Sequence, residues 1–283
     1  MRLALLSPVH GQSIDQIARQ LENYRVFLNP LQLRHYLHIS EASSTDLKDK
    51  LIAFAQRNDH DIVITERSRS TWSTCTAHAF CELVHTALND DVRHDKVLIH
   101  TDTDLLFSTG AVQHLRNHPI GCEANHFRGS SGQWKWSPKV LTDPRIQRLV
   151  HEMLDGDVKA LRQGRVCGAF MPWSVFKPFG VLFNHFFDDQ YFDMNVAQRW
   201  PLNEIAIPTL LRLLLGAEAP FARVLIKAPQ KKKLFTRESI RRSLRSGDCF
   251  GLKKIADSPD DKILRFIMKL QNKIVANSSC SSV

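Results

Sequence analysis

The feature that most constrains the fold is a regular alternation along the first hundred residues, where short apolar runs are separated by longer segments with helical spacing. The apolar runs occupy residues 3–6, 33–39, 61–65 and 96–100. Between them, apolar side chains recur every three or four residues, as on one face of a helix. Alternating strands and helices are typical of an α/β fold with a mostly parallel sheet. We therefore expect ligands to bind in the loops that follow these strands.

The chain has 283 residues, enough for one large domain or two small ones. Because we find no internal repeat and no linker, we predict one domain over residues 1–276 and a disordered tail at 277–283. The apolar start is interrupted by Pro8 and His10, which favours a first buried strand over a signal peptide. No stretch of 18 residues lacks a charged side chain, which argues against a membrane-spanning helix. The six cysteines form no CxxC pair and suit a reducing compartment, so we expect a cytoplasmic protein.

The positive charge of the chain is concentrated near its C-terminus. Residues 222–273 contain 15 Lys and Arg against five Asp and Glu, whereas the rest of the chain has 23 basic and 24 acidic residues. This basic portion fits a solvated helix face, a surface for anionic lipid or nucleic acid, or a cradle for a diphosphate. Arg237, Arg241 and Arg245 have the spacing of one helix side, which favours an exposed face. The pair 253–254 is two lysines among apolar neighbours, which indicates a buried anionic partner.

Two acidic clusters are candidates for chemistry. Asp102 and Asp104 follow the apolar run 96–100 at a spacing of two, so their side chains point the same way along an extended chain. This DxD arrangement can hold a divalent ion and a nucleoside diphosphate, but Asp and Thr are also common turn residues. Asp188 and Asp189 form a second pair in a Phe-rich segment, and this pair has a weaker claim to a direct role.

A single carboxylate, Glu204, begins the strongly apolar segment 203–211. Partial desolvation there raises the pKa of a carboxyl group and makes it a usable base near neutral pH. The alternative is a glutamate in the first turn of a helix, where it interacts favourably with the helix dipole. The residues alone favour that second interpretation.

Several of these segments occur in a fixed order. They are residues 3–10, 36–40, 69–88, 101–106, Asn203-Glu204 followed by Thr209-Leu210, residues 235–238, Leu244, Ser246 and residues 250–254. In this order they resemble the core-2/I-branching family of glycosyltransferases, particularly its bacterial members. The chain departs from the family pattern where Asn203 replaces the first acid of a catalytic pair, where Ser40 replaces an acid, and where the loop at 101–104 reads TDTD.

The resemblance implies a GT-A-like fold and an inverting transfer of a sugar from a nucleotide-sugar donor, most simply a UDP-sugar, usually without a metal. It places Glu204 at the position of the catalytic base and Lys254 at the lysine that binds the donor diphosphate, with Arg237 and Lys233 as further candidates. On the nucleotide side it implies His10, Asp104 and Trp72. For the acceptor we add Trp173, as a stacking platform, and Asp189. No metal site is expected; if Mn²⁺ or Mg²⁺ is needed, Asp102 and Asp104 are its ligands.

The sequence leaves alternative functions open. The basic portion is compatible with a nucleic-acid-binding protein, although no nucleic-acid-binding motif accompanies it and we expect no such partner. A metal-dependent phosphoryl transferase built on Asp102 and Asp104 is a further alternative, but a phosphate-binding glycine loop is missing. For a glycosyltransferase we expect a hexosyl or N-acetylhexosaminyl donor and a saccharide or lipid-linked saccharide acceptor, as in bacterial surface polysaccharide or lipopolysaccharide synthesis. Surplus cations would then hold the enzyme at the inner face of the cytoplasmic membrane.

Overall fold

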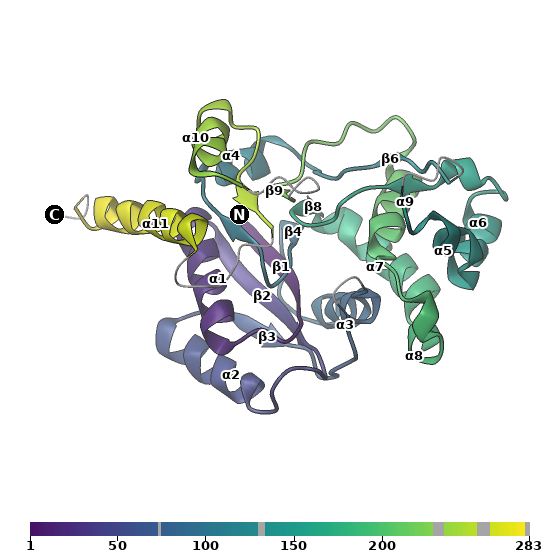
Figure 1. Cartoon of the computed structure of the whole chain (residues 1–283), viewed down its shortest axis with the longest axis horizontal. Coiled ribbons are helices and arrows are strands. Elements are labelled where there is room, and N and C mark those ends of the chain that lie inside the picture. The colour runs from purple at the N-terminus through teal and green to yellow at the C-terminus, as the bar shows by residue number, and fades with distance from the viewer. Residues whose placement is uncertain (73–74, 130–133, 229–234, 254–260, 281–283) are drawn as a thin grey trace.

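The fold is built on a five-stranded sheet with the strand order β3-β2-β1-β4-β8 (Figure 1). The computed structural model describes residues 1–72, 75–129, 134–228, 235–253 and 261–280. The central strands are β1 (Arg2–Val9), β2 (Gln32–Ile39), β3 (Ile62–Ile64), β4 (Lys96–Ile99) and β8 (Ala169–Pro172). The first four are parallel, and β8 pairs antiparallel with β4. The four strands expected from the apolar runs and the mostly parallel sheet are therefore confirmed.

The register brings the carboxyl ends of the central strands to one edge of the sheet. Val9 pairs with Ile39, and Leu6 pairs with Ile99, so β1, β2 and β4 end close together. The backbone N–H of His100 continues the ladder by donating to the Leu6 carbonyl at 3.0 Å. The loops after these strands therefore begin at the same edge.

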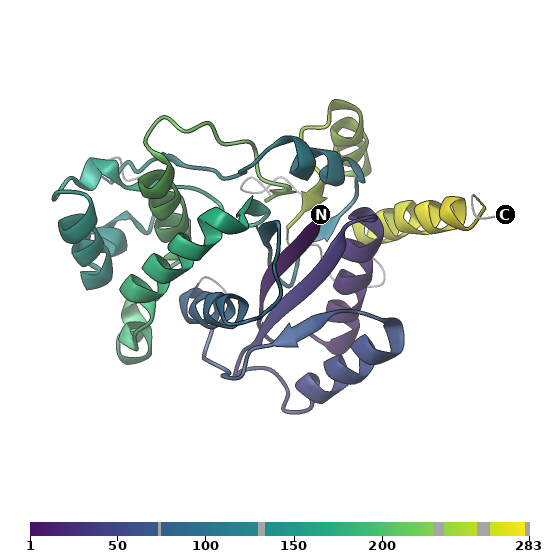
Figure 2. The same cartoon turned by 180° about the vertical axis from the view of Figure 1, so that it is seen from behind.

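Helices cover both faces of the sheet, and the alternation of side chains along β1 explains why. Leu3 and Leu5 pack with Tyr24 and Phe27 on one face, and Ala4 and Leu6 belong to a separate cluster on the other. The first layer contains α1 (Ile14–Phe27) and α2 (Leu47–Asn58), and the second contains α3 (Ala77–Leu88) and α7 (Trp173–Phe187). Figure 2 shows the same layers from behind.

The part of the chain from residue 110 to 215 has less regular apolar spacing, and apart from the helical interpretation of residues 203–211 we did not predict its elements. Its helices are α4 (Gly110–Asn117), α5 (Ser137–Thr142), α6 (Pro144–Met153), α7, α8 (Tyr191–Met194) and α9 (Asn203–Leu215). The phenylalanines of α7 lie at helical spacing and are buried, although Pro178 stands inside the helix. Helix α7 crosses α3 closely because Gly180 has no side chain: a Cβ there would lie 2.7 Å from Val84 Cγ1.

Two small sheets complete the core. One is a two-stranded pair of β6 (Asn125–His126) and β7 (Arg162–Gln163). The other has β10 (Gly251–Leu252) between β5 (Leu105–Leu106) and β9 (Ile226–Lys227). The antiparallel pairing of β10 with β5 brings the C-terminal portion of the chain next to the loop that contains Asp102 and Asp104.

Two helices end the described chain: α10 (Arg237–Ser246) and α11 (Lys262–Cys280). Helix α10 starts at a reciprocal capping box between Thr236 and Ser239. Helix α11 continues past Asn277, the residue at which we expected a disordered tail to begin, and ends at Cys280. Within the described residues, neither these helices nor any other combines the length and the apolar character that crossing a bilayer requires.

A buried histidine at the strand edge makes stability depend on pH. The His100 ring is fully buried and stacks on Tyr24 with the ring centroids 4.5 Å apart. Burial lowers the pKa of His100 to about 4. Because this pKa lies below that of the unfolded chain, the neutral ring stabilises the fold fully above about pH 6.5, and this contribution is lost as the pH falls toward 4.

We therefore expect His100→Phe, which keeps an aromatic ring against Tyr24, to reduce the acid sensitivity of the fold. From these pKa values, the His100 contribution at pH 5 is smaller than at pH 7.5 by about 2 kcal/mol. Denaturant unfolding of both proteins at the two pH values measures this difference. Equal losses of unfolding free energy in the two proteins would show that the imidazole is not responsible.

Candidate active site

Three loops meet beyond the carboxyl ends of the central strands. The backbone N–H of His10, after β1, donates to Asp102 Oδ2 at 2.7 Å, and Asp102 follows β4. His10 Nδ1 lies 2.7 Å from the hydroxyl of Thr71, in the loop after β3. Trp72 is the next residue, and its ring lies 3.3 Å from the guanidinium carbon of Arg199. The structure thus brings together His10, Trp72 and Asp102 from three separate segments.

The two acids of the DxD sequence occupy different environments. Asp104 is fully buried, where its Oδ2 accepts a hydrogen bond from the Thr101 backbone at 2.8 Å. Its Oδ1 is buried without a hydrogen-bond partner among the described residues. Asp102 is partly exposed. We expected Asp104 to line the nucleotide, but its burial rules out direct contact with a ligand in this conformation, so Asp102 is the acid that faces the strand edge.

Burial also sets the protonation of this acidic pair. Desolvation raises the pKa of Asp102 to about 6 and that of Asp104 to about 6, and the positive charge of Lys253 acts against this rise in both. Both groups are therefore ionised at neutral pH, although with a smaller margin than ordinary aspartates. The protein keeps two nearby carboxylates ionised because a cation lies close to them.

Lys253 is this cation, and strand pairing explains its position. Leu252 of β10 pairs antiparallel with Leu105 of β5. Lys253, which follows Leu252, therefore lies beside Asp104, which precedes Leu105. The Lys253 Nζ lies 2.6 Å from the Cys167 Sγ. Burial lowers the pKa of Lys253, but its interactions with Cys167, Asp104 and Glu204 raise the pKa by more, so it lies well above its ordinary value. Burial raises the pKa of the Cys167 thiol to about 11, so near neutral pH the negative charges are those of the two carboxylates. That a lysine of the pair 253–254 has a buried anionic partner stays a prediction, with Asp104 beside Lys253 as the candidate partner.

Glu204, whose charge also acts on Lys253, lines a large polar cavity. It lies in the first turn of α9, and its backbone carbonyl accepts a hydrogen bond from Gly164 at 2.9 Å. A Cβ on Gly164 would lie 1.8 Å from the Glu123 carbonyl oxygen, so only glycine allows the segment after β7 to approach the segment before β6 this closely. The cavity has a volume of about 830 Å³. It is bounded by residues 123–126, 128 and 162–165, by Trp134, by Glu204 and Arg212 of α9, and by residues 217–218 after that helix.

The cavity lining has the chemistry of a carbohydrate-binding site. Asn125, Gln163 and four arginines supply amide and guanidinium donors, and Glu123 and Glu218 supply acceptors. The partly exposed Trp134 adds an aromatic ring, which packs edge-on against Trp200 at 6.4 Å. Sugars present many hydroxyl groups and apolar C–H faces, and a mixed polar and aromatic lining matches both.

Other predicted site residues lie elsewhere. Trp173 is next to Asp95 at the amino end of β4, where its N–H donates to the Asp95 carbonyl at 3.0 Å, so it is at the opposite edge of the sheet from Asp102. Arg237 is exposed on α10, and its Nε lies 3.5 Å from the Lys262 carbonyl oxygen. Lys233 and Lys254 lie outside the described residues. Trp173 and Arg237 therefore do not join the site.

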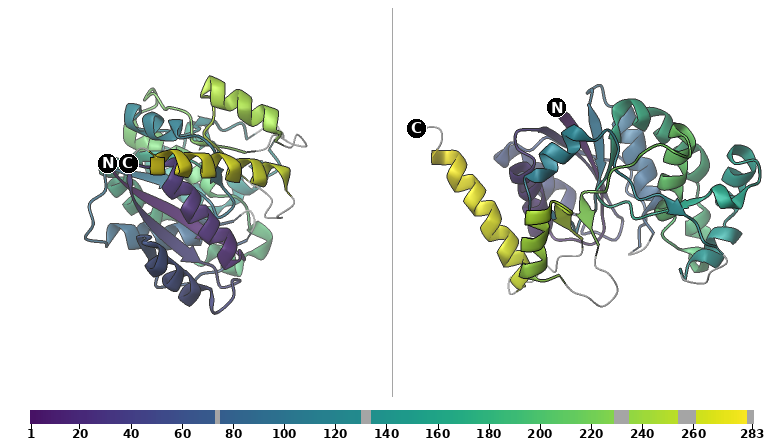
Figure 3. Two further views of the ribbon diagram at one scale, coloured as in Figure 1. Left: turned by 90° about the vertical axis from the view of Figure 1, so that its left-hand side faces the viewer. Right: turned by 90° about the horizontal axis from the view of Figure 1, so that it is seen from above.

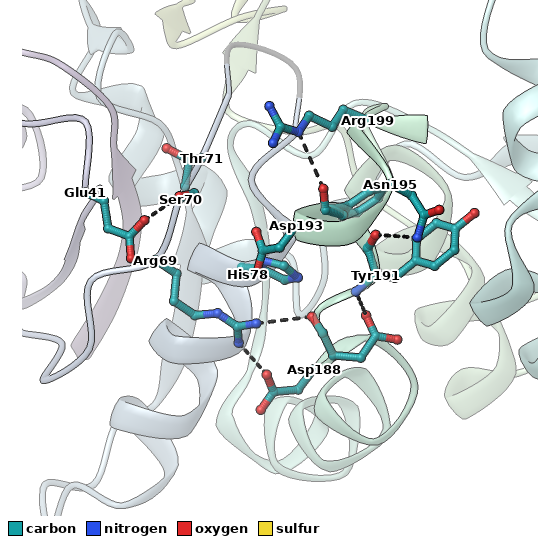
Figure 4. A network of polar contacts seen from close by, with 12 residues as sticks. Glu41, Arg69, Ser70, Thr71, His78, Asp188, Tyr191, Asp193, Asn195 and Arg199 are labelled. Atoms are coloured by element: carbon teal, nitrogen blue, oxygen red, sulfur yellow. Dashed lines mark hydrogen bonds and ion pairs between the residues drawn. The ribbon is translucent and has the colours of Figure 1, made fainter. Parts of the chain in front are cut away.

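Asp189 belongs to a polar network that links the loop after β3 to α7 and α8. Figure 4 shows Arg69 and Asp188 of this network. Its Oδ1 accepts hydrogen bonds from Arg145 at 3.3 Å and from the Tyr191 backbone at 3.1 Å, and it does not line the cavity. Arg69 donates to Asp188 at 2.5 Å and to the Asp189 carbonyl at 3.1 Å. The acidic pair therefore fixes the loop that carries Thr71 and Trp72, which is a structural role.

Asp102 and Asp104, the ligands we named for the case that a metal is needed, lie near a cation of the protein itself. The described residues contain no group of three His, Cys, Asp or Glu side chains that could hold a metal ion. Asp102 already accepts a backbone hydrogen bond, Asp104 is buried, and Lys253 places a positive charge near both. An ammonium group in this position repels a second cation and neutralises the same carboxylates.

Comparison with family models and with curated proteins gives no match. Among solved structures, the chain is similar to the galactosyltransferase LgtC in complex with donor and acceptor sugar analogs, with 9% identity over 96% of each chain and a TM-score of 0.48. It is also similar to the mannosyltransferase PcManGT from Pyrobaculum calidifontis in complex with GDP-Man and Mn²⁺, with 18% identity, 63% of this chain and 46% of that chain covered, and a TM-score of 0.36. The chain thus spans less than half of PcManGT. Because these TM-scores are below 0.5, the likeness does not decide the function.

Proposed function

We propose that this protein is an inverting glycosyltransferase that moves a sugar from a nucleotide-sugar donor to a hydroxyl group of a saccharide acceptor. The observation that carries the proposal is the pairing of β10 with β5, which places Lys253 beside Asp104 at the strand edge. Glu204, which lines the cavity, contributes to the raised pKa of the same lysine. The cation Lys253 at the strand edge is therefore within electrostatic reach of Glu204, a carboxylate that lines the polar cavity. Transfer with inversion needs such a pair, a cation for the leaving group and a base for the acceptor.

The donor binds at the carboxyl edge of the sheet, next to His10, Trp72 and Asp102. The ammonium of Lys253 faces the diphosphate, where negative charge develops on the phosphate oxygen as its bond to the anomeric carbon breaks. A preorganised cation stabilises this charge without rearranging during the reaction. Lys253 thus takes the role that the family resemblance gives to Lys254, which stays a candidate for a second contact.

The acceptor binds in the cavity beside Glu204. Its hydroxyl oxygen attacks the anomeric carbon from the face opposite the diphosphate and forms the new glycosidic bond. The hydroxyl proton passes to the Glu204 carboxylate, and the nucleoside diphosphate leaves with the electron pair of the broken bond. The products are an elongated saccharide, a free nucleoside diphosphate and a protonated Glu204.

A panel of UDP-, GDP- and CMP-sugars tests the proposed reaction with the full chain. We expect one nucleoside diphosphate-sugar, most simply a UDP-hexose or UDP-N-acetylhexosamine, to raise the melting temperature and to release its nucleotide when a saccharide acceptor is added. Bacterial surface polysaccharide and lipopolysaccharide fragments are suitable acceptors. A failure of every donor to bind or to react would contradict the proposed function.

We expect this activity to persist in a chelator, since Lys253 supplies positive charge near the two carboxylates. Turnover measured after dialysis against EDTA should differ from untreated enzyme by less than about twofold. Mn²⁺ and Mg²⁺ are added back as controls. If EDTA abolishes turnover and Mn²⁺ restores it, Asp102 and Asp104 are metal ligands and the assignment of Lys253 is wrong.

A further inference from the structure

A basic surface formed by α10 and α11 takes no part in the proposed reaction. We define this basic face by the side chains that share one orientation on the two helices, which are Arg237, Arg241, Arg245, Lys262, Arg265, Lys269 and Lys273. Helix α11 has 19 residues and no acidic side chain. In Figure 3 it extends from the body of the molecule with α10 beside its amino end.

The basic side chains of α11 lie opposite the side that packs on the protein. Leu264, Ile267 and Gln271 are buried, and Gln271 accepts a hydrogen bond from Asn23 of α1 at 3.3 Å. A helix turns by about 100° per residue, so the mean direction of the four basic residues of α11 lies about 170° around the helix axis from that of the buried residues. The two sets are therefore on opposite sides of the helix. The orientation of the helix is fixed at its start, where Asp261 accepts hydrogen bonds from the backbone of Ile263 at 2.7 Å and of Leu264 at 2.8 Å.

Helix α10 adds its cations next to this face. Ile240 and Ser243 are buried, so Arg237, Arg241 and Arg245 point away from the body of the protein. The Arg241 guanidinium lies 5.6 Å from the centre of the Phe266 ring of α11. This contact and the approach of Arg237 to the Lys262 carbonyl join the basic residues of both helices into one surface.

Apolar side chains flank the cations. Phe266, Leu270 and Ile274 lie along one border of the basic residues of α11, where they pack against the core with one part and stay partly exposed with another. Val275 is 48% exposed near the end of the helix. Nucleic acid offers phosphates but little for such apolar side chains to contact. The boundary between lipid headgroups and acyl chains offers both anionic charge and apolar volume, and amphipathic helices with this division bind there.

We propose that the basic face of α10 and α11 binds the surface of a bilayer that contains anionic lipids. The charged side chains contact the headgroups, and the flanking apolar side chains enter the interface. This attachment is independent of the transfer reaction, and it holds the enzyme beside acceptors that are themselves lipid-linked. Each Lys or Arg near an anionic surface changes partitioning by about fivefold, and salt screens this attraction.

The test is cosedimentation of the full chain with vesicles of phosphatidylcholine alone or of phosphatidylcholine mixed with the anionic lipid phosphatidylglycerol. We expect binding only to the anionic vesicles, and release at high salt. Replacing Lys262, Arg265, Lys269 and Lys273 by Gln should weaken partitioning by roughly hundredfold or more. The matched control replaces four exposed cations far from this face, Lys48, Arg57, Arg93 and Lys177, by Gln.

The control variant has the same net charge and should still bind the vesicles. Equal loss in both variants would mean that only net charge matters, and absence of binding by the unmodified protein at low salt would overturn the proposal. Binding to RNA or DNA that competes with the vesicles and depends on the same four residues would instead identify a nucleic-acid surface. Melting temperatures of the two variants establish that both are folded.

Discussion

Glu204→Gln should reduce turnover by roughly 10²- to 10⁴-fold, the usual contribution of a positioned general base. The amide keeps the size and the hydrogen-bonding capacity of the side chain but cannot accept the acceptor's proton. Donor binding should persist, because the strand edge with His10 and Asp102 is unchanged. Steady-state kinetics with the donor identified in the panel, together with titration of the nucleotide by calorimetry, separates these two effects.

Glu218→Gln is the matched control for this experiment. Glu218 lines the same cavity but is exposed in the loop after α9, whereas Glu204 lies in the first turn of that helix. We expect the control to alter the KM for the acceptor by a few-fold at most and to leave kcat unchanged. Turnover of Glu204→Gln near that of the unmodified enzyme would rule out Glu204 as the base. It would then act only at the helix N-terminus, the alternative that its sequence position allows.

The first half of the fold was predictable because its signals are local. Apolar runs of strand length followed by segments of helical period determined β1, β2, β3 and β4, and parallel pairing then requires their carboxyl ends to meet. The proximity of His10 and Asp102 follows from this topology. The long helix α7 was missed because its phenylalanines occur among Pro178 and Gly180, which usually interrupt helices.

The site was harder to predict because its groups meet through pairings between distant parts of the chain. The sequence drew attention to the two lysines at 253–254. Only the register of two short strands, β10 and β5, places Lys253 beside Asp104, because Leu252 pairs with Leu105. Arg69 and Arg145, which hold Asp188 and Asp189, have no local signal, since their partners are 119 and 44 residues away. Exposure also cannot be read from spacing: Asp102 and Asp104 alternate regularly, yet Asp104 alone is fully buried.

Lys253→Met should reduce turnover by roughly 10²- to 10³-fold, comparable to the loss of one preorganised donor to a developing negative charge. Methionine keeps the length and much of the volume of the side chain but removes its charge. The change also leaves the Asp104 carboxylate buried without its nearby cation, so the pKa of Asp104 should rise above about 6. Ionising Asp104 then opposes folding, and the stability of the variant should fall more steeply than that of the unmodified protein as the pH rises through neutrality.

The double variant Lys253→Met, Asp104→Asn separates the two roles of the lysine. Removing the buried carboxyl group should restore stability and abolish the extra pH dependence, because the charge that needed Lys253 is gone. Turnover should stay low if the ammonium acts on the leaving diphosphate, since the double variant still lacks it. Asp104→Asn alone, which retains Lys253, should be far more active than either variant with methionine. If the double variant instead recovers turnover together with stability, Lys253 serves only to neutralise Asp104, and the cation for the leaving group must be sought elsewhere in the basic portion of the chain.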